Sequence, residues 1–282
     1  MKLLLVVSFF AICTSSFGQT KSLLYEVKKN GHQTSYLYGT IHLVPDSLFL
    51  FTKKLKKIIS QSDEIIFEIV NMNDSQSLTS ILKQKDKNTF DLFSEKEKDS
   101  VLLWGAQLID LDTATFQRIY GQLKPINLIQ LSSLKALQED AIAVDFELMK
   151  FADKEGITKS ELETIAFQLS LFDQLPDPII RDMILHEMRK TSHDQQLEAK
   201  LYALYKNQDI EGLAALINET DDLNAFTGEF LINRNKKWLP IIIEKMLNKS
   251  CFVAVGAGHL GGNSGLIQLL KQEGFSVTPI LF

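Results

Sequence analysis

Both ends of the chain carry short apolar runs of strand length, and a long stretch with helical spacing of apolar residues separates them. Near the N-terminus, alternation predicts strands over 23–28 and 35–40, joined by a turn at Asn30-Gly31. Apolar residues at helical spacing predict a helix over 45–60, and the compact apolar run 64–70 predicts a third strand. The N-terminal part therefore reads as a strand-rich segment with one helix.

The middle of the chain is predicted to be mostly helical. Helices are expected within 74–140, 145–155, 178–206, 209–218 and 225–247. The capping box Ser94-x-x-Glu97 and Pro125 mark two helix starts, and Gly156 stands where a left-handed C-cap is needed. The segment 157–164 follows this cap and predicts a strand, although it is polar for one.

The C-terminal end has the clearest pattern. An apolar strand over 251–255 leads into a glycine-rich turn, a helix over 264–272 and a strand over 275–280. A strand–helix–strand unit of this kind builds parallel sheet.

The predicted fold class is therefore α/β: a mixed, mostly parallel sheet flanked by helices, with a large helical insertion. The insertion covers about 74–247 and is interrupted by the strand at 157–164. The chain contains no low-complexity linker and no tandem repeat. We expect residues 19–282 to form a single domain.

The first eighteen residues have the three-part pattern of a secretory signal peptide. Lys2 precedes the apolar run Leu3–Cys13, and Ser16-Phe17-Gly18 offers small residues before a cleavage point. The run is too short for a membrane-spanning helix, which needs about 20 apolar residues. We therefore expect an exported protein, periplasmic or secreted, with no transmembrane segment in the mature chain.

Composition and charge narrow the classes of partner. The 282 residues include 30 Lys and Arg against 35 Asp and Glu, a net charge of −5, so no basic field exists to bind nucleic acid. Two cysteines, one of them in the signal segment, rule out a disulfide framework. The remaining one, Cys251, begins an apolar strand and is interpreted as a small buried filler.

Two of the five histidines share one local pattern. Gly39-x-x-His42 and Gly256-x-x-His259 each close a predicted strand. In an open α/β sheet, ligands bind beyond the carboxyl ends of the strands, and glycine lets the backbone approach a ligand closely.

Two acids occupy equivalent places. Glu68 and Glu163 lie at or near the ends of the predicted strands 64–70 and 157–164. If the strands run parallel, both acids share one edge with His42 and His259, and this donor set suits a divalent metal ion. A hydrogen-bonded structural histidine, or a glutamate in a buried ion pair, is the alternative interpretation.

Other motifs are weaker. Gly256-x-Gly258-x-x-Gly261 matches the dinucleotide fingerprint, but the chain ends soon afterwards, with no acid to hold a ribose. His186-Glu187 begins like a zinc-protease helix, but Lys190 stands where the second ligand is required.

The segments that carry these residues resemble the TraB/GumN family, which also includes the TIKI-type metalloproteases. They are YLYGTIHLVPDS, IIFEI, VDFELMKFADKEGITKSELET, LINRNKKW and VAVGAGHLGGNSGLIQLLKQEGFSVTPI. The resemblance implies a fold similar to erythromycin esterases and the ChaN-type haem-binding lipoproteins. It implies a site built from His42, His259 and Glu68, with Gly39 and Gly256 as motif glycines. Further positions that match family motifs are Glu163, Gln168, Arg234 and Asn235.

Two functions remain open from the sequence. The first is a metal-dependent hydrolase acting on peptides, with His42, Glu68 and His259 holding Mn, Co or Zn. The metal would lower the pKa of a bound water and polarise the scissile carbonyl. The second is a protein that binds haem, a metal or a peptide without turnover. Peptide or small-molecule partners fit both.

The hydrolase hypothesis assigns roles to four more residues. Glu163 is a candidate general base or further ligand, and Arg234 is a candidate for steadying an oxyanion or a substrate carboxylate. Gln168 and Asn235 are candidate substrate-binding positions.

Overall fold

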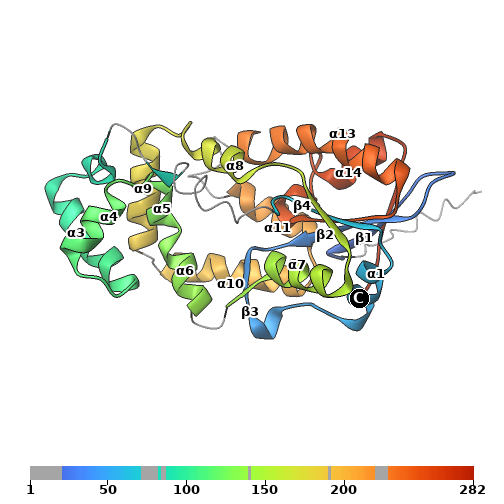
Figure 1. The fold of residues 1–282 in the computed structure, drawn as a ribbon, viewed down its shortest axis with the longest axis horizontal. Helices are drawn as coiled ribbons and strands as arrows, with labels where there is room; N and C mark the ends of the chain where they lie inside the picture. Colours follow the sequence, from blue (N-terminus) through green and yellow to red (C-terminus); the bar gives the residue numbers. More distant parts are fainter. Residues whose placement is uncertain (1–20, 71–81, 84–86, 139–140, 190–191, 220–227) are drawn as a thin grey trace, which may run out of the picture.

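A six-stranded sheet in the order β6-β4-β7-β2-β1-β8 organises the chain. The computed structural model describes residues 21–70, 82–83, 87–138, 141–189, 192–219 and 228–282 (Figure 1). The expected signal peptide and the first residues of the expected helical insertion lie outside these ranges. The strands are β1 (Leu24–Lys28), β2 (Ser35–Thr40), β4 (Glu64–Phe67), β6 (Thr158–Glu161), β7 (Cys251–Gly256) and β8 (Ser276–Pro279).

Four neighbouring strands run parallel. β6, β4, β7 and β2 pair in parallel, whereas β1 is antiparallel to both β2 and β8. The predicted α/β class with a mostly parallel mixed sheet is confirmed. The C-terminal unit differs in one respect: β7 and β8 point the same way, but β2 and β1 lie between them.

Strand composition follows position in the sheet. The central strand β7 is almost wholly buried, including Cys251, because helices cover both faces of a parallel sheet. β6 lies at the edge and pairs on one side, so its sequence TKSE is tolerated there. Gly31, at φ +82°, provides the left-handed residue of the predicted turn between β1 and β2.

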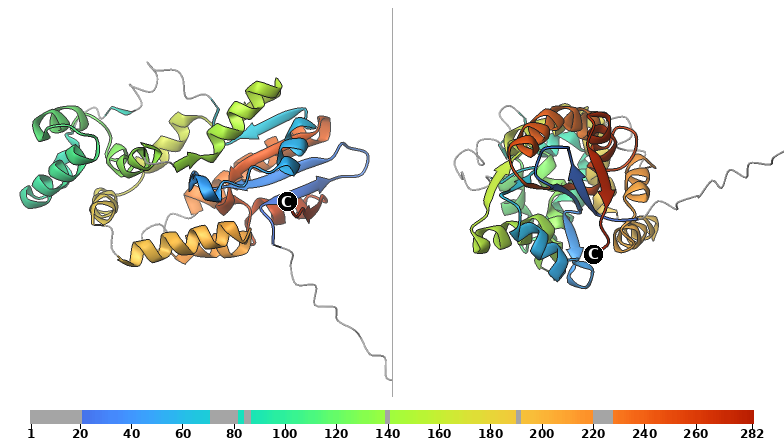
Figure 2. Two further views of the ribbon diagram at one scale, coloured as in Figure 1. Left: turned by 90° about the horizontal axis from the view of Figure 1, so that it is seen from below. Right: turned by 90° about the vertical axis from the view of Figure 1, so that its right-hand side faces the viewer.

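Helices enclose the sheet on both faces. Figure 1 shows α13 and α14 along one side, and α1 and α7 along the other; the end-on view in Figure 2 shows the strands surrounded by helices. The helices of this part are α1 (Lys53–Ser60), α7 (Val144–Glu155), α10 (Ser192–Lys206), α11 (Ile210–Glu219), α13 (Asn233–Asn248) and α14 (Leu266–Gln272). One apolar core joins them to the sheet. Within the described ranges, no helix combines the length and apolarity needed to cross a bilayer.

A second apolar cluster lies among the helices on the left of Figure 1. Its elements are a 3₁₀ turn (Thr89–Leu92), α3 (Glu95–Leu108), α4 (Thr113–Tyr120), α5 (Ile126–Ile129), α6 (Leu131–Gln138) and α9 (Asp177–Met188). The predicted capping box is present, because Glu97 Oε2 accepts from the Ser94 amide at 2.9 Å. Pro125 precedes α5 as predicted.

The predicted helix over 45–60 is wrong in its first half. Leu43–Pro45 forms the short strand β3, which pairs with β5 (Ala141–Ala143), and a 3₁₀ turn follows. The α1 helix starts only at Lys53, where the Thr52 side chain accepts from the Leu55 amide at 3.2 Å. Pairing with a strand about a hundred residues away overrides the local helical pattern.

Two other elements differ from the prediction. A helix, α8 (Ile165–Phe172), follows β6, and its almost uniformly apolar sequence carries no helical periodicity that would reveal it. The expected helix over 225–247 has a π-helical turn, Gly228–Ile232, before α13 begins. Both elements contribute to the candidate site.

Glu64, at the amino end of β4, fastens α13 to the sheet. Its side chain is 2% exposed, and it pairs with Lys245 at 2.7 Å and Lys249 at 2.8 Å. Burial raises the Glu64 pKa, but the two ammonium groups outweigh this effect and hold the pKa at about 2. These two ion pairs lie at the amino end of β4, whereas Glu68 follows its carboxyl end.

We expect Glu64→Gln to lower the free energy of unfolding by about 1–3 kcal/mol at pH 7, because both ammonium groups lose their counter-ion. The folded pKa lies below the ordinary glutamate value of 4.5, so the stabilisation is full above that value and is lost as the pH falls toward 2. Denaturant unfolding of wild type and variant at pH 7 and pH 3 measures both effects. The difference should shrink at pH 3, and the exposed Glu273→Gln is the control.

Candidate functional site

The carboxyl ends of the four parallel strands bring four predicted residues to one edge of the sheet. His42 follows β2, Glu68 follows β4, Glu163 follows β6 and His259 follows β7. Adjacent parallel strands end at the same edge, so residues separated by up to 217 positions become neighbours. The Arg234 side chain from α13 joins this group.

Arg234 connects the buried members of the group. Its Nε and one terminal nitrogen donate to Glu163 Oε1 at 3.0 and 2.6 Å, and the same terminal nitrogen donates to Glu68 Oε2 at 2.5 Å. The other terminal nitrogen donates to the Phe230 carbonyl at 2.9 Å and faces His259 Nε2 at 3.2 Å. All five N–H groups of the guanidinium are therefore engaged within the protein.

The start of α13 explains how Arg234 is held. Phe230 lies in the π-helical turn before α13, and its carbonyl accepts a hydrogen bond from the guanidinium. One helical turn further on, the Trp238 ring lies 4.6 Å from the guanidinium carbon. The Trp238 Nε1 donates to Glu163 Oε2 at 2.9 Å, so both oxygens of this carboxylate are occupied.

His259 is buried as a neutral imidazole. The Asn235 side-chain amide donates to the carbonyls of His259 and Ser264 at 3.1 and 2.9 Å, so its oxygen faces His259 Nδ1 at 2.7 Å. Nδ1 therefore carries the proton, and the hydrogen-bond network assigns Nε2 as the acceptor from Arg234. Burial, the strongest cause, lowers the His259 pKa to about 3.

Glu68 is held from three sides. Its Oε1 accepts from the Gly256 amide at 2.8 Å, and its Oε2 accepts from Gln168 at 3.0 Å and from Arg234. The Gly256 bond comes from the second Gly-x-x-His motif, and Gln168 comes from the unexpected helix α8. The amide of Gln168 thus positions the strand glutamate.

The charges of the buried glutamates and Arg234 do not cancel. Burial raises the Glu68 pKa, but the positive charge of Arg234, the electrostatic interaction with His42 and the hydrogen bond from the Gly256 amide outweigh it and hold the pKa at about 2. Glu68 and Glu163 thus share the single positive charge of Arg234. With His259 neutral, the buried group keeps a net charge of −1 beside the strand ends.

His42 differs from the other members because it is accessible. Its side chain is 81% exposed, and its Nδ1 lies 3.6 Å from Asp145 Oδ2. Asp145 Oδ1 in turn accepts from the Thr40 hydroxyl at 3.1 Å. The contact with Asp145 is the main cause that raises the His42 pKa to about 8.

Asp145 is the site residue that the sequence prediction missed. It lies in the first turn of α7, within the VDFEL segment that carries the family resemblance. An acid in the first turn of a helix is usually explained by the helix dipole, so its type gave no separate signal. The pairing with His42 becomes visible only in three dimensions.

The two motif glycines allow close approach of the strand ends. A Cβ at Gly256 would lie 3.3 Å from Glu68 Oε1, and a Cβ at Gly39 would lie 3.2 Å from the Ala257 Cα. Side chains at these positions would press the two Gly-x-x-His segments and Glu68 apart.

A pocket of about 160 Å³ opens beside this group. Its lining residues are His42, Phe67, Glu68, Ile69, Asp145, Met149 and Gln168. The lining combines an apolar wall with an accessible imidazole, two acids and an amide.

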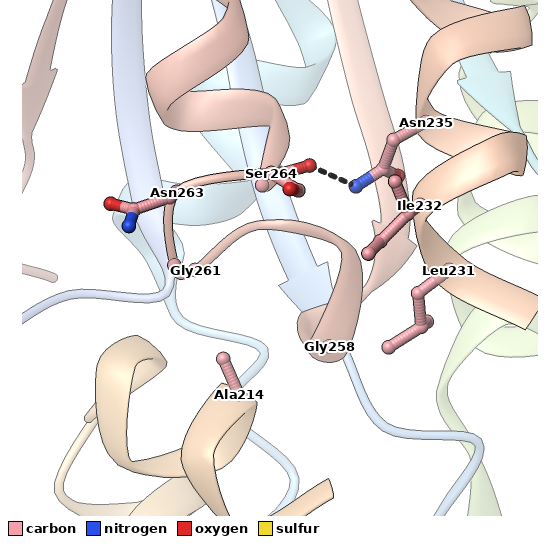
Figure 3. Close-up of a pocket in the computed structure, with 10 residues that line it drawn as sticks. Ala214, Leu231, Ile232, Asn235, Gly258, Gly261, Asn263 and Ser264 are labelled. Atoms are coloured by element: carbon pink, nitrogen blue, oxygen red, sulfur yellow. Dashed lines mark hydrogen bonds between the residues drawn. The ribbon is translucent and has the colours of Figure 1, made fainter. Parts of the chain in front are cut away.

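The glycine-rich loop forms a separate pocket of about 150 Å³, shown in Figure 3. Its glycines are used for packing against α11: a Cβ at Gly258 would lie 2.4 Å from the Ile217 Cδ1. A Cβ at Gly261 would lie 2.8 Å from the Ile210 carbonyl oxygen. Close helix packing therefore explains the spacing that resembles a dinucleotide fingerprint.

The arrangement does not fit a metal ion held jointly by His42, Glu68 and His259. The His259 Nε2 and the Glu68 Oε2 both face the Arg234 guanidinium. Among the residues that the structure describes, no group of three or more His, Cys, Asp or Glu side chains is placed to hold a metal. His186 lies elsewhere, 2.8 Å from Asp194.

Comparison with known proteins adds one finding. The model of the TraB/PrgY/gumN family matches residues 23–279 of the 282-residue chain. Searches of curated proteins and of solved structures found no significant match.

We expect Gly261→Ala to lower the free energy of unfolding by about 1–3 kcal/mol, because the added Cβ would collide with the α11 backbone. Thermal or denaturant unfolding measures the loss. Gly228→Ala is the matched control, since apart from its chain neighbours no atom of the described residues lies within 4 Å of its added Cβ. Equal stability of the Gly261 variant and wild type would contradict the packing role of this glycine.

Proposed function

This chain belongs to the TraB/PrgY/gumN family, and from that premise we propose that it is a hydrolase acting on peptides, with the pocket beside His42 as its reaction site. The resemblance to the TraB/GumN family, which includes the TIKI-type metalloproteases, supports the peptide substrate. The signal-peptide pattern of residues 1–18 supports action outside the cytoplasm.

One observation carries the proposal: His42 is the accessible member of an otherwise saturated polar group. Glu163, Arg234 and His259 have their hydrogen-bonding atoms engaged by one another and by neighbouring residues. His42 faces Asp145 through Nδ1, and no described hydrogen bond involves its Nε2. That nitrogen is available to a water molecule in the pocket.

The chemistry follows from these contacts. In the proposed reaction the neutral form of His42, which predominates above about pH 8, takes a proton from a water molecule through Nε2 as the water attacks the scissile carbonyl. Asp145 stabilises the resulting imidazolium. Gln168 gives one N–H to Glu68 and has a second N–H for the developing oxyanion. The imidazolium then protonates the amide nitrogen as the C–N bond of the tetrahedral adduct breaks, which releases the amine and leaves the new carboxyl group.

The divalent ion predicted from the sequence supplies no step of this proposal. A bound ion would polarise the carbonyl and acidify the water. Two of the three ligands predicted for it, Glu68 and His259, are engaged by Arg234, so the proposal assigns water activation to the third, His42.

We expect His42→Ala to reduce peptide cleavage by about 10²–10⁴-fold, because the proton acceptor is lost. Asp145→Asn should lower kcat by a similar factor and leave KM nearly unchanged, because the amide cannot stabilise the imidazolium. The measurement is mass spectrometry of new termini in a diverse peptide mixture, followed by kinetics on one cleaved sequence.

His32→Ala is the matched control. His32 is an exposed histidine in the turn between β1 and β2, at the end of the hairpin away from the pocket, and it contacts the Leu247 carbonyl of α13. This variant should cleave like wild type. The proposal fails if folded wild-type protein cleaves no peptide, or if His42→Ala cleaves at the wild-type rate. Stoichiometric peptide binding without cleavage would instead indicate a binding protein.

A further inference from the structure

The buried guanidinium of Arg234 lies between two of the metal ligands predicted from the sequence, Glu68 and His259, and the candidate further ligand Glu163. One of its terminal nitrogens lies 2.5 Å from Glu68 and 2.6 Å from Glu163, and the other lies 3.2 Å from His259 Nε2. A divalent ion bound by these three side chains would lie about 2.0–2.2 Å from each ligand atom. An ion at those distances would overlap the guanidinium nitrogens, so a single cation fits.

Lone-pair counting supports the same conclusion. Glu68 Oε2 accepts from both Gln168 and Arg234, and Glu163 accepts from Arg234 and Trp238. The lone pair on His259 Nε2 faces Arg234 as well. Glu68 Oε1 accepts one described hydrogen bond, from the Gly256 amide, so at most this oxygen of the buried set keeps a lone pair for a second cation.

Removal of the guanidinium would leave a donor set suited to metal. Two carboxylates and one neutral imidazole would remain. The side chains of Glu68, Glu163 and His259 are only 13%, 6% and 4% exposed. Their charge of −2 would be balanced by one divalent ion, and the mixture of oxygen and imidazole ligands suits Mn²⁺, Co²⁺ and Zn²⁺.

We propose that Arg234 is the resident cation of this site, that the native chain holds no divalent metal between Glu68, Glu163 and His259, and that loss of the guanidinium creates a metal site there. The proposal concerns the cation alone. Its test does not depend on whether the protein cleaves peptides, because the measured quantities are metal content and melting temperature.

The test compares wild type with Arg234→Ala. Each protein is stripped with a chelator, incubated with Mn²⁺, Co²⁺ or Zn²⁺, desalted and analysed for metal and for Tm. We expect Arg234→Ala to retain about one ion per chain and its Tm to rise by about 5 °C or more with metal, since an ion at about 100 times its Kd stabilises the folded state. Wild type should retain no ion at this cluster, and its Tm should not change.

Three variants locate the ion. Arg234→Ala combined with Glu68→Gln removes one ligand and should lose the retained ion. Arg234→Lys keeps a positive charge and should stay metal-free. Lys236→Ala removes an exposed basic residue of the same helix and should behave like wild type.

Two outcomes overturn the proposal: a wild-type ion that Glu68→Gln abolishes, or folded Arg234→Ala that retains no ion. If wild type and Glu68→Gln retain the same amount of metal, that ion is bound outside the cluster. Such a result means that the wild-type cluster itself holds no metal, as proposed. If Arg234→Ala fails to fold without metal, its recovery on addition of metal supports the proposal, and failure to recover overturns the predicted metal site.

Discussion

The site depends on one buried positive charge shared by two carboxylates. Removing charged groups from water is costly, and a buried pair is tolerated when every donor and acceptor finds a partner. Arg234 meets that condition with five engaged N–H groups, which tie Glu68, Glu163 and His259 to the start of α13. The π-helical turn before α13 supplies the fifth acceptor, so a local irregularity of the helix is part of the same network.

This network separates the polar residues at the sheet edge into two halves. The buried half around Arg234 is saturated and fixes protonation states: Glu68 is ionised and His259 is neutral. The accessible half consists of His42 and Asp145, which meet beside the pocket. Because the buried half is fixed, it provides a constant negative field next to an imidazole that remains free to exchange a proton.

The scaffold makes this arrangement through strand order. Four neighbouring parallel strands end at one edge, and each delivers one of the four polar residues. Glycines at the ends of β2 and β7 keep the two histidine segments close to Glu68 and to each other. The helices then complete the site, since α7 provides Asp145 and α8 provides Gln168.

The sequence by itself determined the α/β class, the strands that carry His42, Glu68 and His259, and the family, because apolar periodicity and short motifs are local properties of a chain. It placed Glu163 near a strand end although that strand is polar. Tertiary structure alone decided what these residues contact. The engagement of Arg234 by two carboxylates, the pairing of Asp145 with His42 and the identity of α8 all depend on long-range packing. Sequence periodicity cannot reveal such contacts, because Glu163 and Glu68 lie 71 and 166 positions from Arg234. Asp145 lies more than a hundred positions from His42.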